Sequence, residues 1–94
     1  MKEIQVRNMI STSGNYVPNQ FEIKKKVKDY YQHYFQSYDT IICKYDVKGL
    51  ILDTNALHYS RTTSKYLYMY LNMDRKELLK GIKDKSIRVR NLNK

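Results

Sequence analysis

The stretch SRTTSKY, residues 60–66, holds the side chains whose types and spacing come closest to a chemical site. Its hydroxyl groups precede an apolar segment of helical period, so one of them is expected to cap a helix that begins near Thr63. The first backbone N–H groups of a helix lack partners inside it, and together with hydroxyls and cations they hold phosphate or carboxylate groups. The predicted anion site consists of Ser60, Arg61, Thr62, Thr63 and Lys65.

The same stretch also has a purely structural interpretation. One hydroxyl is enough to cap a helix, and the others are ordinary turn residues. Arg61 and Lys65 would then stay in solvent or pair with Asp53. Both interpretations are open at the level of sequence.

A second candidate site combines aromatic rings with lysines between residues 24 and 38. Single-stranded nucleic acid is bound by rings that stack on bases beside cations that contact phosphates. Successive residues of a strand face opposite sides, so some of the rings must belong to the core. We assign Tyr31 and Phe35 to the core and expect the other rings to be exposed. The predicted site residues are Lys24, Lys25, Lys26, Lys28, Tyr30, Tyr34 and Tyr38.

The charge of the chain supports a polyanionic ligand. The net charge is +9, with seven cations and five acids in residues 1–47 but eleven cations and four acids in residues 48–94. Such an uneven basic charge is typical of nucleic-acid-binding proteins. Solubility alone, an A·T-rich genome or an acidic protein partner are the alternatives. The residues expected to add non-specific attraction are Lys76, Lys80, Lys83, Arg88 and Arg90.

Sequence signatures of enzymes are absent. There is no CxxC, HExxH, GxSxG or Walker-type motif, and three glycines cannot form a Gly-rich nucleotide loop. Asp39, Asp46 and Asp53 share a spacing of seven, which we interpret as turn and strand-end positions. His33 and His58 are too few for a zinc site. We therefore expect no catalytic residue, metal or cofactor, with a small metal-independent nuclease as an open alternative.

The single cysteine, Cys43, excludes an internal disulfide. It lies in the apolar run TIIC, where a buried and inert thiol is expected. The lack of disulfides and of a signal peptide predicts a reducing, cytoplasmic setting. No apolar run approaches the ~18 residues that suggest a membrane-spanning helix, so no membrane partner is expected.

The predicted fold is a single α+β domain of residues 1–94. Period-two alternation and turn signals predict that residues 3–53 form hairpins of a small antiparallel sheet with four to five strands. KKKVKD, residues 24–29, is expected to be a solvated excursion, either a hairpin tip or an insertion. Residues 61–85 are predicted to form two helices that cover one face of the sheet. Residues 86–94 form a basic tail or an edge strand.

Three stretches carry a resemblance: IQVRNMISTSGNYVPNQFEI (4–23), YFQSYDTIICKYDVKGLILD (34–53) and YSRTTSKYLYMYL (59–71). Together they resemble a family of small phage- and prophage-encoded proteins of uncharacterised function, which share an RNM…GN.VPNQF, FQSY and YSxTTxKY pattern. The residues that match the pattern are Arg7, Asn8, Asn19, Gln20, Phe35, Gln36, Ser37, Tyr38, Tyr59, Ser60, Thr62, Thr63, Lys65 and Tyr66. Residues 24–33 and the region from Met73 onward depart from it and carry much of the surplus charge.

The resemblance implies a phage accessory protein and gives no catalytic residue. Small phage proteins outside the virion usually bind host machinery or host defence. The expected function is a non-catalytic binder of nucleic acid, as RNA or single strand, or of a nucleoprotein complex, an anti-CRISPR-type inhibitor being one form. The alternative is a protein-only inhibitor that docks on an acidic surface of a host or defence protein. An exposed sheet edge or Tyr-rich face would equally support a homodimer.

Overall fold

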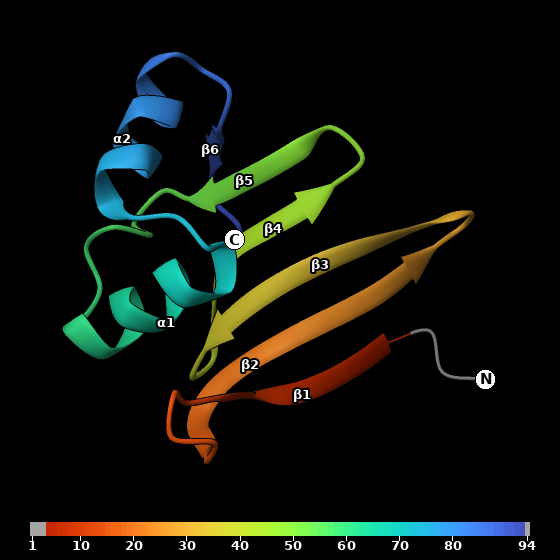
Figure 1. Cartoon of the computed structure of the whole chain (residues 1–94). Coiled ribbons are helices and arrows are strands. Elements are labelled where there is room, and N and C mark those ends of the chain that lie inside the picture. The colour runs from red at the N-terminus through yellow and green to blue at the C-terminus, as the bar shows by residue number, and fades with distance from the viewer. Residues whose placement is uncertain (1–3, 94) are drawn as a thin grey trace.

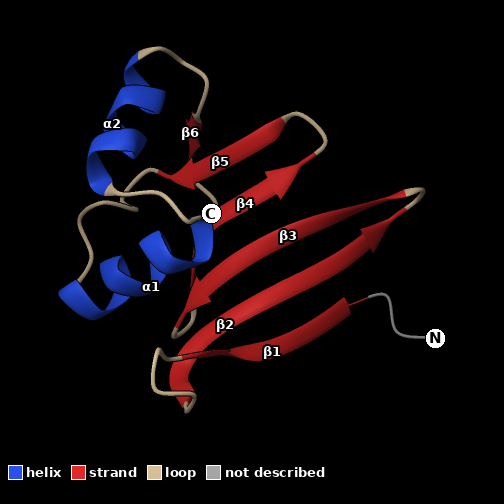
Figure 2. Ribbon diagram, viewed as in Figure 1, coloured by secondary structure: helices blue, strands red, loops and turns tan. Residues whose placement is uncertain are grey.

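The computed structural model describes residues 4–93, which form an α+β fold (Figure 1). The strands are β1 (Ile4–Ile10), β2 (Tyr16–Val27), β3 (Tyr30–Ser37), β4 (Thr40–Asp46), β5 (Gly49–Asp53) and β6 (Arg88–Arg90). The helices are α1 (Arg61–Leu71) and α2 (Arg75–Lys83). All strands form one sheet in sequence order, antiparallel except for the β5–β6 pair. Figure 2 shows the two helices gathered at one end of this sheet.

The predicted α+β class is confirmed, but the sheet has six strands rather than four to five. The additional strand is β6, within the segment that the sequence predicts as a tail or an edge strand. It follows α2, and a helical crossover returns the chain parallel to the strand it left. Ile51, Leu52 and Asp53 of β5 therefore pair in parallel with Arg88–Arg90.

The β2–β3 hairpin is longer than the sequence predicts. The segment 24–29 is the hairpin tip of the two predicted alternatives, and not an insertion: β2 continues through Lys24 to Val27, and eight cross-strand pairs join it to β3. Lys28 and Asp29 alone form the turn, with Lys28 at φ 54°. Lysine has a low strand propensity, and the continuous ladder with its tyrosine-rich partner strand overrides it. The lysines consequently occupy fixed, alternating positions of a strand.

The hydrophobic core lies between the helices and one part of the sheet. Phe35, Leu67 and Leu78 are fully buried, and the Phe35 ring stacks on Tyr70 at a centroid distance of 5.5 Å. An irregularity in the β3–β4 register gives β4 an extra residue, and both Ile42 and Cys43 are completely buried there. Figure 1 shows the far end of the β2–β3 hairpin extending well beyond the helices.

The sheet has a covered face and an open face. Phe35 stacks on α1 and the Ser37 hydroxyl bonds to Thr63 of α1, so the odd-numbered residues of β3 point to the helices. Even-numbered residues of β3, and the residues paired with them, point to the other side. We call this side, which no described helix covers, the open face. A row across it is formed in register by Val6, Ile23, Tyr34, Lys44 and Ile51.

Residues of the three motif stretches, 4–23, 34–53 and 59–71, meet where α1 begins. The Ser37 and Thr63 hydroxyls are 2.8 Å apart, and Gln20 lies opposite Ser37 in the β2–β3 ladder. The Tyr38 N–H donates to the Asn19 carbonyl at 2.6 Å. These polar residues therefore join the sheet to the N-terminus of α1, which gives the motifs a structural role.

Gln20 is fully buried, and its side-chain nitrogen and oxygen have no hydrogen-bond partner among the described residues. An unsatisfied buried amide costs about 1–3 kcal/mol. We expect Gln20→Met, which roughly conserves volume, to raise the free energy of unfolding by about 1–2 kcal/mol, measured by urea denaturation. Gln36→Met is the matched control, because the Gln36 amide donates to the Tyr38 carbonyl near the surface and should give no gain. A loss of stability in the Gln20 variant would contradict this reading.

Candidate nucleic-acid interface

Most carboxylates of the described chain are used to hold the backbone. Asp46, Asp74 and Asp84 each accept a hydrogen bond from a nearby backbone N–H, and Asp53 accepts two such bonds. Glu77 completes the capping box of α2 by accepting the N–H of Asp74. Turn and strand-end roles were predicted for Asp46 and Asp53 and are confirmed. Because the acids serve the fold, few are available to neutralise surface cations.

Two ion pairs within 4.0 Å join residues of the 4–93 region. Arg7 Nε lies 3.8 Å from Glu22 Oε2, and Arg88 Nη2 lies 2.7 Å from Asp46 Oδ1. Burial opposes ionisation of Asp46, but hydrogen bonds from the Lys48 amide and Arg88 lower its pKa below the ordinary value. Arg88 is thereby neutralised, which corrects its assignment to the polyanion-binding residues.

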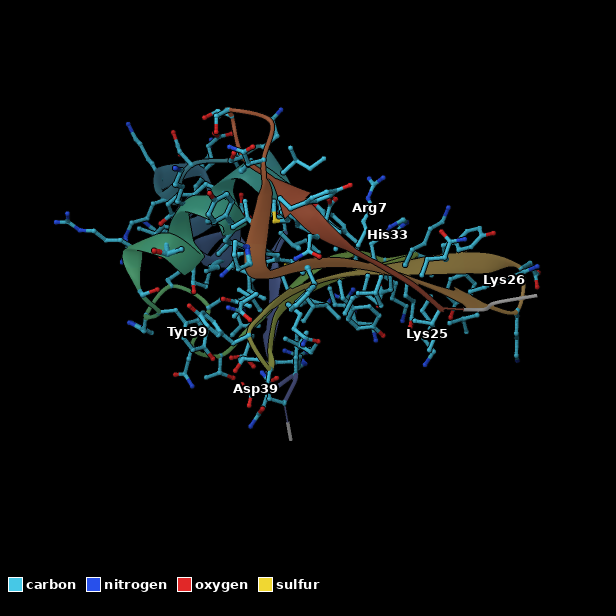
Figure 3. The ribbon with its side chains drawn as sticks, turned by 90° about the horizontal axis from the view of Figure 1, so that it is seen from below. Arg7, Lys25, Lys26, His33, Asp39 and Tyr59 are labelled. Carbon is cyan, nitrogen blue, oxygen red and sulfur yellow. The ribbon has the colours of Figure 1, made fainter. Side chains whose placement is uncertain are left out.

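The distal hairpin, residues 24–34, presents lysines on both sides of a two-stranded ribbon. Lys24 and Lys26 share one side with Tyr31, and Lys25 points to the other. Figure 3 shows Arg7 and His33 on one side of the sheet and Lys25 on the opposite side. Lys24 Nζ lies 4.2 Å from the centre of the Tyr31 ring, a cation–π contact that places charge beside an aromatic surface.

The tyrosines of β3 differ in part from their predicted positions. Phe35 is in the core as predicted, but Tyr31 is 47% exposed, because the helices do not reach this part of the hairpin. Tyr30 and Tyr34 lie half-buried on the open face, with Lys44 Nζ 5.6 Å from the Tyr34 ring. Tyr38 is 59% exposed but lies in the β3–β4 turn, at the other end of the strand, so it is not part of the distal hairpin.

At the N-terminus of α1, one residue of the predicted anion site is buried and the other four are exposed. The helix begins at Arg61, and the Ser60 hydroxyl caps it by accepting the Thr63 N–H at 3.3 Å. Thr63 is 4% exposed, and its hydroxyl bonds to Ser37 and Ser60. Its assignment to an anion site is wrong, because the hydroxyl is used between the helix and the sheet. Thr62 is exposed.

A second basic surface lies along the outer side of α1. Leu57, Tyr59, Arg61, Ser64, Lys65, Tyr68 and Arg75 line a groove of about 510 Å³. We call it the α1 groove. The Arg75 Nη1 donates to the Leu57 carbonyl at 3.3 Å, which holds the guanidinium at the groove. Arg61 and Lys65 were predicted as anion-binding residues; Arg75 was missed, because only the packing of α2 against this loop brings it here.

The remaining predicted cations do not join either surface. Lys76, Lys80 and Lys83 are exposed along α2, and none of them lines the α1 groove. Arg90 is exposed at the end of β6, with its guanidinium donating to the Val89 carbonyl at 2.7 Å. These side chains add charge to the molecule, and none of them makes a cation–π contact with a ring of the described residues.

Residues 4–93 give little support for a nucleophilic cysteine or a metal site. Cys43 is buried as predicted, and burial raises its pKa to about 12, so the thiolate that would act as a nucleophile is scarce at neutral pH. No group of three or more His, Cys, Asp or Glu residues in this range could hold a metal ion. Within the same residues, no helix has the length and apolar character needed to cross a membrane.

Fold and surface together define a small α+β protein with a projecting lysine-rich hairpin and a basic groove beside its first helix. The chain belongs to a family of unknown function, DUF8033, whose model matches residues 4–87. The matched region contains β1 to β5 and both helices, and it ends just before β6. No curated protein and no solved structure matches the chain.

Proposed function

We propose that the protein is a non-catalytic binder of nucleic acid, as RNA or another single strand, acting on it alone or within a nucleoprotein complex. The observation that carries the proposal is the distal hairpin. It holds Lys24, Lys25, Lys26 and Lys28, for which no carboxylate lies within ion-pair distance among the described residues, beside three tyrosine rings. Lysines that contact phosphates release counterions, and exposed rings stack on bases.

The α1 groove gives such a ligand a second contact. Its three cations, Arg61, Lys65 and Arg75, come from two helices and surround Ser64 and tyrosine side chains. Guanidinium groups bind phosphate through paired hydrogen bonds, which suits a fixed phosphate position better than lysine does. The hairpin would then supply most of the attraction, and the groove would hold one phosphate of the same strand.

The biological setting that we propose is phage–host conflict. The motifs in residues 4–23, 34–53 and 59–71 resemble those of small phage- and prophage-encoded proteins, which supports an accessory protein in the cytoplasm of a bacterial host. A protein with surplus charge and exposed rings suits an anti-CRISPR-type inhibitor of a nucleic-acid-guided defence complex.

One feature favours the alternative of a protein-only inhibitor. β1 is an edge strand, and its side chains Ile4, Val6 and Ile10 are 51%, 58% and 54% exposed. An exposed apolar edge can add a strand from another protein. An acidic protein partner would be attracted by the same surplus of cations.

A salt titration with a labelled 12-nucleotide single-stranded RNA tests the proposed function. At ~3.4 Å per nucleotide this length roughly matches the longest dimension of the molecule, 39 Å. We expect log Kd, measured by fluorescence anisotropy, to rise linearly with log salt at a slope of about 3, from four to five phosphate contacts.

The RNA recovered after the titration should be intact with and without a chelator. If the protein does not bind the RNA at about 50 mM salt, or if the Kd does not change with salt, the proposed nucleic-acid binding is wrong. Cleavage of the RNA would contradict a non-catalytic function and would support the alternative of a small nuclease.

A further inference from the structure

Over β1 to β3, the open face is an apolar and aromatic surface that no described helix covers. Val6 is 58% exposed there, and Phe21, Ile23 and Tyr34 are only half-buried although they sit on neighbouring central strands. On the covered face, by contrast, Phe35 is completely buried under α1. A surface of this kind requires a partner whose chemistry matches its side chains.

The rings on this face are arranged along the hairpin. Gln36 is the cross-strand partner of Phe21, so Phe21 and Tyr34 are diagonal neighbours, roughly 7–8 Å apart. Tyr30 precedes Tyr34 by four residues on the same side of β3, roughly 14 Å away at ~3.4 Å per residue. The Tyr34 hydroxyl donates to Gln32 Oε1 at 2.9 Å, which anchors the edge of the ring to its own strand.

The charge of the open face is positive. Lys25 and Lys44 point to this side, and Lys44 Nζ lies 5.6 Å from the Tyr34 ring. The carboxylates of β4 and β5 on the same side are compensated: Asp46 is paired with Arg88, and Asp53 is 4% exposed and hydrogen-bonded. Aromatic rings next to ammonium groups are suited to bind a flexible polymer with an anionic backbone. Flat apolar groups attached to that backbone would stack on the rings.

We infer that the open face binds single-stranded nucleic acid, with bases stacked on Phe21, Tyr34 and Tyr30 and phosphates beside Lys25 and Lys44. This inference rests on the proposed nucleic-acid binding and adds its substrate class: unpaired strands in preference to duplexes. Paired bases are already stacked and cannot lie on these rings. A second copy of the chain would bring the same lysines together across a symmetric interface, which disfavours it.

The test compares the 12-nucleotide RNA with the same sequence in a duplex, using wild type and the double variant Phe21→Leu/Tyr34→Leu. Leucine keeps the face apolar and removes the rings. We expect the single-strand Kd to rise about 10- to 100-fold and the duplex Kd to change less than about twofold, because stacking acts on unpaired bases. Tyr16→Leu is the matched control, since Tyr16 is 77% exposed near the other end of β2, and it should bind as wild type does.

A second readout separates stacking from misfolding. 2-Aminopurine placed within the RNA should lose fluorescence on binding wild type, and retain it with the double variant, whose urea unfolding is measured alongside. Equal wild-type affinity for single strand and duplex, an unaffected double variant, or light scattering that shows a dimer unable to bind RNA would each overturn the inference. If the protein binds both forms equally, the proposed function stands without this face; if it binds neither, both fail.

Discussion

Replacing Lys24, Lys25, Lys26 and Lys28 with glutamine should weaken binding to single-stranded RNA by about 100- to 1,000-fold at 100 mM salt. Each phosphate contact on a single strand contributes ~0.7 to the slope of log Kd against log salt, so four lost contacts lower the slope by about 2.8. At that salt concentration each contact corresponds to roughly a fivefold change in affinity. Fluorescence anisotropy over a range of salt measures both quantities in one experiment.

The control for this variant has the same change of net charge at another place. Lys76, Lys80, Lys83 and Lys85 are exposed on α2 and in the turn that follows it, without the tyrosine neighbours of the hairpin. Replacing these four with glutamine should weaken binding less than about tenfold. An equal loss in the two variants would show that net charge alone drives association, and would contradict a hairpin interface.

Asp53→Asn should lower the free energy of unfolding by about 2–4 kcal/mol at pH 7. Asp53 accepts hydrogen bonds from the backbone of Asn55 and Leu92 and from the side chains of Tyr59 and Asn93, so one buried carboxylate ties the end of β5 to the segment after β6. An asparagine amide turns one acceptor into a donor and removes the charge that strengthens the others. Urea denaturation measures the difference.

The effect of Asp53→Asn should depend on pH. Burial opposes ionisation of Asp53, but the hydrogen bonds from Leu92, Asn55, Asn93 and Tyr59 lower its pKa below the ordinary value. A lowered pKa stabilises the fold above the unfolded-state pKa of about 3.9, and this contribution is lost as the pH falls through the folded-state pKa. The gap between wild type and the variant should therefore shrink below pH ~4.

An exposed aspartate provides the comparison. Asp39 in the β3–β4 turn accepts one hydrogen bond, from the Thr40 hydroxyl at 3.3 Å, and Asp39→Asn should change stability by less than about 0.5 kcal/mol. A gap between wild type and Asp53→Asn that stays constant from pH 7 to pH 3 would show that the charge of Asp53 is not what stabilises this junction.

Local signals predicted much of the fold. Alternation and turn residues located the strands between residues 3 and 53, and the helical period located both helices between residues 61 and 85. These features depend on neighbours in the sequence, which a single chain displays directly. The length of β2 was underestimated because three consecutive lysines argue against a strand, while the cross-strand pairing that stabilises them is a property of the folded hairpin.

The site depended more on tertiary structure. The alternation of residues along β3 predicted which rings share a side of the sheet. It could not predict that the helices do not extend over Tyr31, whose side chain is therefore exposed. Arg75 was missed because it belongs to α2 and reaches the groove only by packing beside Leu57. Thr63 was misassigned because its partner Ser37 lies 26 residues away in the sequence.

The most direct measurement is an NMR titration of isotope-labelled protein with the 12-nucleotide single-stranded RNA at about 150 mM salt. We predict amide shifts concentrated in the distal hairpin, residues 24–34, with smaller shifts around Arg61 and Arg75. Amides of α2 near Lys80 and Lys83 should change little. A spectrum that does not change at saturating RNA, or changes only along α2 and β6, would contradict a nucleic-acid interface on the hairpin.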